Sequence, residues 1–182
     1  WAGAASGAER GDARPQPGDG ARPGEQRARL EVLWGRLAAG LLPVLERGRE
    51  RGVQIAFEPE PGMFIERPAG YLELLARLGP EGDELGLTLD VGHLLCTGDL
   101  PVGRQIRELA PRLVHAHLDD VSGGVHEHRM FGQGDLDLGE TLTALLETGY
   151  DGMAAVELSR DSHRGAAAAE EALARLRAAL AG

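Results

Sequence analysis

The sequence contains no lysine and no asparagine, a single cysteine and few aromatic side chains. Because Cys96 has no second cysteine with which to form an internal disulfide, we expect a reducing compartment, the cytoplasm. No stretch reaches the roughly 18 consecutive apolar residues that a membrane span needs. No charged segment leads into an apolar one as in a secretory signal either. We therefore expect the protein to have no membrane partner.

Positive charge is also scarce. The 19 basic residues, all arginine, are outnumbered by 29 acidic ones, and the formal net charge is -10. The arginines do not gather into a stripe along the chain. Proteins that bind nucleic acid draw much of their affinity from basic groups placed against phosphates. We therefore do not expect nucleic acid as a partner, and a small molecule remains the favoured ligand.

The length of 182 residues and an apolar content of 42% suit one globular domain. Residues 1–25 are rich in Gly, Ala, Pro and Arg and lack periodic apolar positions, so we expect a flexible segment there. Residues 26–182 are expected to form the domain. Because the sequence begins with Trp1 and not with Met, we expect a processed, truncated or incompletely predicted product.

The domain region alternates short apolar runs with helical periodicity. Four buried strands are predicted, at residues 53–57, 85–89, 113–117 and 153–156. Helices are predicted between and around them, at residues 30–52, 66–78, 102–109, 138–148 and 165–180. This alternation is typical of parallel β-α-β units, in which helices cover a sheet. The fold class is therefore α/β with a parallel sheet.

Each predicted strand ends in a side chain that can bind a metal: Glu58, Asp90, His117 and Glu157. Parallel strands bring their carboxyl ends to one rim, where α/β proteins place their sites. Three carboxylates and one imidazole suit Mn²⁺ or Mg²⁺ best, with Co²⁺ and Zn²⁺ as alternatives. The competing interpretation is that each acidic residue caps a helix or a loop. Four such residues at four strand ends favour the metal site.

Further histidines lie close to these positions. His93 follows Asp90 by three residues, and His115 lies on the same face of its strand as His117. We favour a buried role for His115, lower in the core. His126, His128 and Arg129 belong either to the site or to a solvated loop.

Five motifs in order resemble the second half of the xylose isomerase-like superfamily of sugar (phosphate) isomerases and epimerases, which includes the family 2 abasic-site endonucleases. They are FEPEPG at 57–62, LTLDVGH at 87–93, HAHLDD at 115–120, GQGDLD at 132–137 and AVELS at 155–159. The resemblance covers residues 34–180. It implies a TIM barrel of which about four β-α units, the carboxyl-terminal half, are present, with a divalent metal at the rim.

The resemblance also implies roles for individual residues. The metal ligands would be Glu58, Asp90, His117 and Glu157, and Glu58 and Glu157 would also be the catalytic acid and base. His93 would bind substrate, together with either His128 or Arg129, because the position before the Gly-x-Gly turn is ambiguous. We expect Glu60 to structure its loop and not to bind metal.

The implied function is a metal-dependent sugar isomerase or epimerase that transfers a proton through an enediolate. The alternatives are an inosose dehydratase-like or hydroxypyruvate isomerase-like enzyme, an abasic-site endonuclease-like metallohydrolase, and an inactive barrel fragment. The substrate would be a sugar or a sugar-like small molecule. A half barrel exposes two parallel sheet edges, so we expect either a homodimer or a missing amino-terminal half to cover them.

Overall fold

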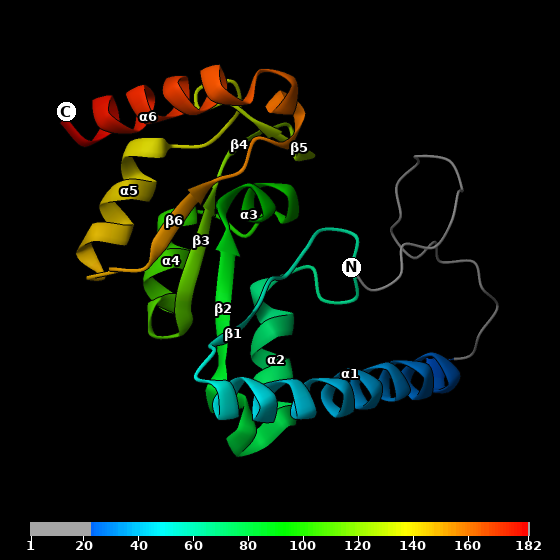
Figure 1. Ribbon diagram of the computed structural model, residues 1–182. Helices are drawn as coiled ribbons and strands as arrows, with labels where there is room; N and C mark the ends of the chain where they lie inside the picture. Colours follow the sequence, from blue (N-terminus) through cyan, green and yellow to red (C-terminus); the bar gives the residue numbers. More distant parts are fainter. Residues whose placement is uncertain (1–22, 182) are drawn as a thin grey trace.

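The predicted strands form one parallel sheet in the computed structural model, which describes residues 23–181 (Figure 1). The sheet order is β1-β2-β3-β6, which is also the order of these strands along the chain. The strands are β1 (Ile55–Phe57), β2 (Leu85–Asp90), β3 (Leu113–Leu118) and β6 (Met153–Val156). Neighbouring strands that follow one another in sequence and run parallel need a crossover connection, and each crossover here contains a helix. The predicted fold class is confirmed.

Five longer helices accompany the sheet: α1 (Pro23–Arg51), α2 (Pro68–Leu78), α4 (Val102–Leu109), α5 (Leu138–Glu147) and α6 (Gly165–Ala181). In space α1 packs on α2, α4 on α5, and α5 on α6. Figure 1 shows α1 and α6 at opposite ends of the molecule. Because α1 begins at Pro23, residues 23–25 of the segment expected to be flexible are helical, and the rest of that segment, 1–22, lies outside the described residues.

The apolar core lies between the sheet and its helices. All six residues of β2 are buried, because this strand has a neighbour on each side. Tyr71 and Leu74 of α2 are fully buried, as is Ile106 of α4. The Tyr71 hydroxyl donates a hydrogen bond of 2.7 Å to the backbone oxygen of Leu85, which joins α2 to the start of β2.

The sequence-based prediction lacks several short elements that lie between the longer helices and strands. They are helix α3 (Val91–Thr97), the antiparallel pair β4 (Asp120–Ser122) and β5 (Val125–Arg129), and the 3-10 helices η1 (Gly79–Glu84), η2 (Ala110–Arg112) and η3 (Ser159–Arg164). Helix α3 starts directly after β2, and Asp90 caps it by accepting the N–H of His93 at 3.0 Å. Gly123 and Gly124, both with positive φ, make the turn between β4 and β5. Elements this short carry too little periodicity to be recognised in sequence.

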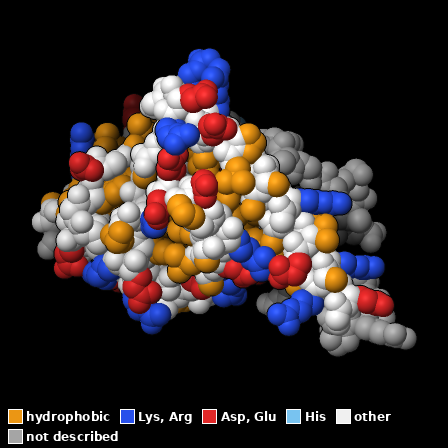
Figure 2. Space-filling model, turned by 90° about the horizontal axis from the view of Figure 1, so that it is seen from below, with side chains coloured by type: hydrophobic (Ala, Val, Ile, Leu, Met, Phe, Trp, Pro, Cys, Tyr) orange, Lys and Arg blue, Asp and Glu red, His pale blue; other side chains and the backbone are white. Residues whose placement is uncertain are grey.

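The sheet is an open half barrel within the described residues. No strand among residues 23–181 pairs with the outer edge of β1 or of β6. Apolar side chains remain exposed near both edges, including Val53 before β1 and Met153 in β6. Figure 2 shows apolar side chains exposed among charged ones on the face seen from below. No helix between residues 23 and 181 is both long and apolar enough to span a membrane.

Leu74 tests the packing of α2 on the sheet. Leu74→Ala should lower the free energy of unfolding by about 2–5 kcal/mol, since it removes buried methyl groups and leaves a cavity. Leu72, on the same helix, is 49% exposed whereas Leu74 is 0% exposed, so Leu72→Ala should change stability by no more than about 0.5 kcal/mol. Urea unfolding followed by circular dichroism measures both, and equal losses would contradict the packing described.

Candidate metal centre

The four side chains expected at the rim come together in the structure. Glu58, Asp90, His117 and Glu157 each offer one ligand atom, and these four atoms all lie within 4.8 Å of one another. His117 Nδ1 lies 2.9 Å from Glu58 Oε1 and 2.9 Å from Glu157 Oε2. Asp90 and His117 are register partners on β2 and β3, and the Glu157 N–H bonds to the Leu118 oxygen at the end of β3. We call this group the rim tetrad.

Asp90 is the buried member of the rim tetrad. Its side chain is 0% exposed, and one oxygen, Oδ1, is used to cap α3. The other oxygen, Oδ2, has no hydrogen-bond partner among the described residues and lies 3.8 Å from His117 Nδ1 and 3.8 Å from His93 Nε2. Burial and the neighbouring Asp119 carboxylate raise the pKa of Asp90 well above its usual value. A buried carboxylate oxygen of this kind requires a proton or a cation.

Glu58 and His117 each shift the pKa of the other in the direction that favours its charged form. Burial acts to raise the pKa of Glu58, but the hydrogen bond to His117 and the charges of nearby histidines outweigh it, so the pKa lies below its usual value. The hydrogen bond from His117 to Glu58 raises the pKa of His117. A positive imidazolium therefore stabilises the surrounding carboxylates. A divalent cation would supply the same positive charge, which is why this donor set fits a metal.

Three further histidines form a second group, the histidine cluster: His93, His126 and His128. His93 Nδ1 lies 2.9 Å from the backbone oxygen of Pro59, and His93 Nε2 lies 3.0 Å from His126 Nε2. Burial, followed by the charges of the other two histidines, lowers the pKa of His126 to about 4. The cluster adjoins the rim tetrad, because His93 Nε2 is 3.8 Å from Asp90 Oδ2.

The structure distinguishes between the two candidate residues before the Gly-x-Gly turn. Side chains alternate along β5, and the His128 ring lies with its centroid 4.5 Å from that of His126. Arg129 instead bonds to Glu127, with Nε 3.0 Å from Oε2, and Glu127 also lies 3.5 Å from Arg160. His128 therefore faces the histidine cluster, whereas Arg129 belongs to a separate ion-pair group. Both residues lie in a strand of the hairpin and not in a solvated loop.

Two other residues considered in the sequence lie outside the rim tetrad. His115 is partly buried one step below His117 on β3, with ring centroids 4.8 Å apart. Glu60 lies in the loop after β1, where its N–H bonds to the Ile65 oxygen and its oxygen accepts the N–H of Met63. Its backbone therefore structures the loop.

The sequence leaves His126 open between the site and a solvated loop, and it gives Asp119 no role there. His126 and His128 are two residues apart on β5, directly after the Gly123–Gly124 turn. A His-x-His pair beside a Gly-Gly turn is the pattern of a hairpin strand with both rings on one face, and it is the signal that could have indicated His126. Asp119 has no comparable signal, because its contacts with Gly92 and His128 depend on how α3 and the hairpin pack together.

Asp120 holds the loop that carries the Gly-x-Gly turn. Its two buried oxygens accept the N–H groups of Gly132, Gly134 and Leu136 at 2.8–2.9 Å. A Cβ on Gly134 would lie only 2.3 Å from the Val121 oxygen and 2.4 Å from Asp120 Oδ1, so only glycine fits there. The HLDD and GQGDLD motifs are thus two halves of one hydrogen-bonded unit.

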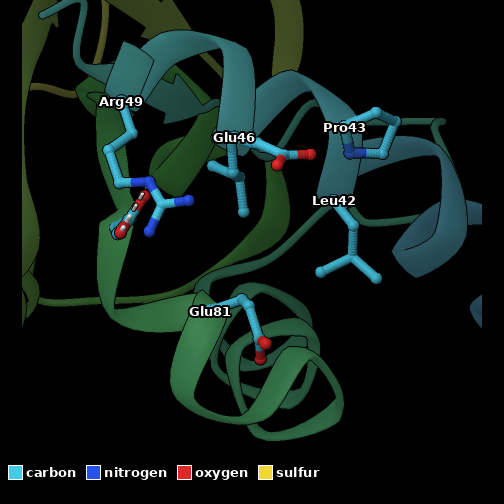
Figure 3. A pocket seen from close by; sticks show the side chains of 7 residues that line it. Leu42, Pro43, Glu46, Arg49 and Glu81 are labelled. Carbon is cyan, nitrogen blue, oxygen red and sulfur yellow. Dashed lines mark ion pairs between the residues drawn. The ribbon is translucent and has the colours of Figure 1, made fainter.

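A hollow at the other end of the sheet is unrelated to the rim. It is a cavity of about 430 Å³ between α1 and η1 (Figure 3). Its lining residues are Leu42, Pro43, Leu45, Glu46, Arg49, Glu81 and Glu84. None of them belongs to the rim tetrad or the histidine cluster. Because η1 precedes β2, this hollow lies where the strands begin and not where they end.

Comparison with known sequences identifies the family. The family profile described as xylose isomerase-like TIM barrel matches residues 16–179, so the chain belongs to this family. Over 145 residues it is 31% identical to an inosose dehydratase of Lacticaseibacillus casei, a match that covers 70% of this chain and 48% of that protein. Over 128 residues it is 27% identical to a fructoselysine 3-epimerase of Shigella flexneri, covering 70% of this chain and 46% of that protein. The chain thus spans about half the length of these curated relatives.

Solved structures show the same architecture. An L-ribulose 3-epimerase superposes with a TM-score of 0.66 at 24% identity, covering 81% of this chain and 54% of that one. A 3-keto-D-glucoside 4-epimerase from E. coli superposes with a TM-score of 0.67 at 19% identity, covering 82% and 55%. At these identities the likeness establishes the fold, a part of a TIM barrel.

Asp120 gives a test of how the site loop is held. Asp120→Ala leaves four backbone N–H groups without their acceptor, those of Val121, Gly132, Gly134 and Leu136. Because each unsatisfied donor costs about 1–3 kcal/mol, a loss of at least about 4 kcal/mol in stability is expected. Asp135, an exposed residue of the same loop, accepts one N–H, that of Gly123, so Asp135→Ala should cost no more than about 1 kcal/mol. Urea unfolding and hydrogen exchange of the 130–136 amides measure the difference. Unchanged exchange in Asp120→Ala would contradict the assignment.

Proposed function

We propose that this chain carries the metal centre of a sugar isomerase or epimerase that moves a proton next to a carbonyl group. The observation that carries the proposal is the buried Asp90 Oδ2, which has no hydrogen-bond donor and lies among three other ligand-type side chains. Relatives named inosose dehydratase and fructoselysine 3-epimerase support a sugar or sugar-like substrate.

The rim tetrad fits a divalent metal. Glu58, Asp90, His117 and Glu157 would hold it, with Mn²⁺ or Mg²⁺ preferred for an oxygen-rich set and Co²⁺ or Zn²⁺ as alternatives. A divalent ion there would supply positive charge against the negative charge that develops on substrate oxygens when an α-proton is removed.

Glu58 and Glu157 are the acid and base of the proposed reaction. Glu58 follows β1 and Glu157 follows β6, the two outer strands of the sheet, and each approaches His117 Nδ1 to 2.9 Å. One carboxylate would remove the proton from the carbon next to the carbonyl, which produces an enediolate. The other would return a proton to the opposite face or to the neighbouring carbon. His93 and His128 would orient the hydroxyl groups of the substrate.

The open half barrel requires a further wall. Both outer edges of the sheet are free within residues 23–181, and a substrate bound at the rim would be enclosed on one side only. A second set of β-α units, from a longer form of the protein or from a second copy of the chain, would pair with β1 and β6 and close the barrel.

A metallohydrolase with several metals is the second candidate function. The histidine cluster adjoins the rim tetrad through His93 and Asp90, and three imidazoles suit Zn²⁺. The net charge of -10 disfavours a nucleic-acid substrate for such an enzyme.

Metal binding is the first test, and Asp90 is its most informative position. Titrated Mn²⁺ should raise the stability of the purified chain by about 2.7 kcal/mol at a hundred times its Kd, because the ion binds only the folded state. Asp90→Asn should abolish this gain, since the amide cannot supply the anionic ligand. Thermal unfolding with chelator and with Mn²⁺ measures both.

Glu60→Gln is the matched control for this test, since Glu60 lies beside the rim but outside the tetrad. It should retain the full gain. An undiminished gain in Asp90→Asn would contradict the metal site. The stoichiometry separates the two candidate functions: one ion per chain supports the rim tetrad alone, whereas a second Zn²⁺ that is lost in His126→Gln supports the multinuclear centre.

Proton exchange tests the chemistry itself. In D₂O with saturating Mn²⁺, the chain should incorporate deuterium at the carbon next to the carbonyl of a ketohexose, followed by NMR. Glu157→Gln should slow this exchange by about 10²–10⁴-fold, the usual contribution of a general acid or base, while Glu60→Gln should not. A chain that binds Mn²⁺ through the tetrad and shows no exchange over a panel of sugars would instead be a metal-binding barrel fragment.

A further inference from the structure

Asp119 is a fully buried carboxylate that belongs to neither the rim tetrad nor the loop of Asp120. It follows β3, and Oδ1 accepts the N–H of Gly92 at the start of α3 with a length of 3.0 Å. Its other oxygen, Oδ2, lies 3.0 Å from His128 Nδ1. Neither of these last two atoms makes a hydrogen bond among residues 23–181, so their 3.0 Å approach is a close contact between a carboxylate oxygen and a ring nitrogen. Asp119 therefore contacts both α3, 27 residues before it, and β5 of the hairpin that follows it.

Gly92 is an independent observation that the Asp119 carboxylate needs space beside the start of α3. A Cβ at Gly92 would lie 2.4 Å from Asp119 Oδ1 and 2.5 Å from Oδ2. Real Cβ atoms do not approach oxygen this closely, so any other residue at position 92 would displace the carboxylate. The glycine of the DVGH motif thus makes room for Asp119.

His128 shows the effect of the contact on the backbone. Its φ is 46°, and it is the one non-glycine residue with positive φ between residues 23 and 181. This conformation costs about 1 kcal/mol or more for such a residue and persists where the surroundings hold it. The strained backbone places the ring beside Asp119 on one side and beside His126 on the other, with 4.5 Å between the two ring centroids.

We propose that Asp119 is a positioning residue that keeps the hydrogen of the His128 ring on Nδ1 and so leaves Nε2 as the nitrogen that faces ligands. A buried carboxylate only accepts, so the ring nitrogen next to it carries the hydrogen. Orientation of a functional imidazole by a carboxylate on its other nitrogen is a general device in enzyme and metal sites.

The consequence for substrate rests on the proposed function. His93 is oriented in the same sense, because the Pro59 oxygen can only accept and therefore takes the hydrogen on His93 Nδ1. His93 Nε2 then lies 3.0 Å from His126 Nε2, so of the two oriented rings His128 is the one whose Nε2 is left for a ligand. An Nε2 that carries no hydrogen accepts hydrogen bonds, which suits the hydroxyl groups of a polyol or sugar and not carbonyl oxygens.

The tautomer of His128 can be measured directly in protein labelled with ¹⁵N-histidine. At a pH where the ring is neutral, long-range ¹H–¹⁵N correlation should show Nδ1 protonated and Nε2 unprotonated, with the signal assigned by its loss in His128→Gln. In Asp119→Asn the amide oxygen can still accept the Gly92 N–H, which turns the NH₂ group toward His128. The tautomer should then reverse.

Asp135→Asn is the control, since it makes the same chemical change on an exposed carboxylate that bonds the hairpin turn at Gly123. It should leave the His128 tautomer unchanged. Gly92→Ala is a second variant that should also release His128, because its Cβ displaces the Asp119 carboxylate while residue 119 itself stays aspartate. A wild-type ring protonated on Nε2, or an Asp119→Asn spectrum equal to that of wild type, overturns the proposal. The wild-type spectrum alone shows which ring nitrogen of His128 carries the hydrogen, so the proposal is tested even where a variant does not fold.

An activity measurement separates this proposal from the proposed function. In the deuterium-exchange assay, Asp119→Asn should raise KM about tenfold with little change in kcat, the pattern of lost binding that is common to ground and transition states. Absence of exchange in the wild type would refute the isomerase function, while the tautomer of His128 would still decide the role of Asp119.

Discussion

The buried Asp90 carboxylate is the interaction on which the rest of the rim depends. One oxygen caps α3 and so fixes the direction in which the chain leaves β2. The other oxygen has no donor and lies between His117 and His93. A carboxylate buried in this way is costly without a compensating positive charge. The cost of burying this carboxylate falls where the ends of the four parallel strands meet. We therefore interpret the site as a metal centre.

Three buried aspartates each have a separate structural role. Asp90 contributes to the rim tetrad, Asp119 contacts His128 and α3, and Asp120 binds the loop of the Gly-x-Gly turn. Two of these contacts need a glycine opposite the carboxylate, Gly92 for Asp119 and Gly134 for Asp120. Gly92 and Gly134 therefore leave the space that the side chains of Asp119 and Asp120 occupy. The hairpin of β4 and β5 is held to the sheet by these carboxylates as well as by apolar packing.

The rim tetrad could be predicted because its members follow from strand order alone. Each is at the end of an apolar run, and parallel strands in sequential order necessarily bring those ends together. The structure confirms that Glu58, Asp90, His117 and Glu157 meet. The positions of His126 and Asp119 do not follow from strand order, because they depend on a three-residue strand, a tight turn and the packing of this hairpin against α3. The choice between His128 and Arg129 likewise needed the alternation of side chains along β5.

The sequence by itself determined the class of fold, the strands, and which side chains lie at the carboxyl ends of the sheet, since hydrophobic periodicity and strand order are local properties. Only the tertiary structure decided which oxygen of Asp90 is unpaired, which ring faces the site at β5, and why Gly92 and Gly134 are glycines. These features depend on distances between segments that are far apart in the chain. Such distances are set by packing, and no periodicity encodes them.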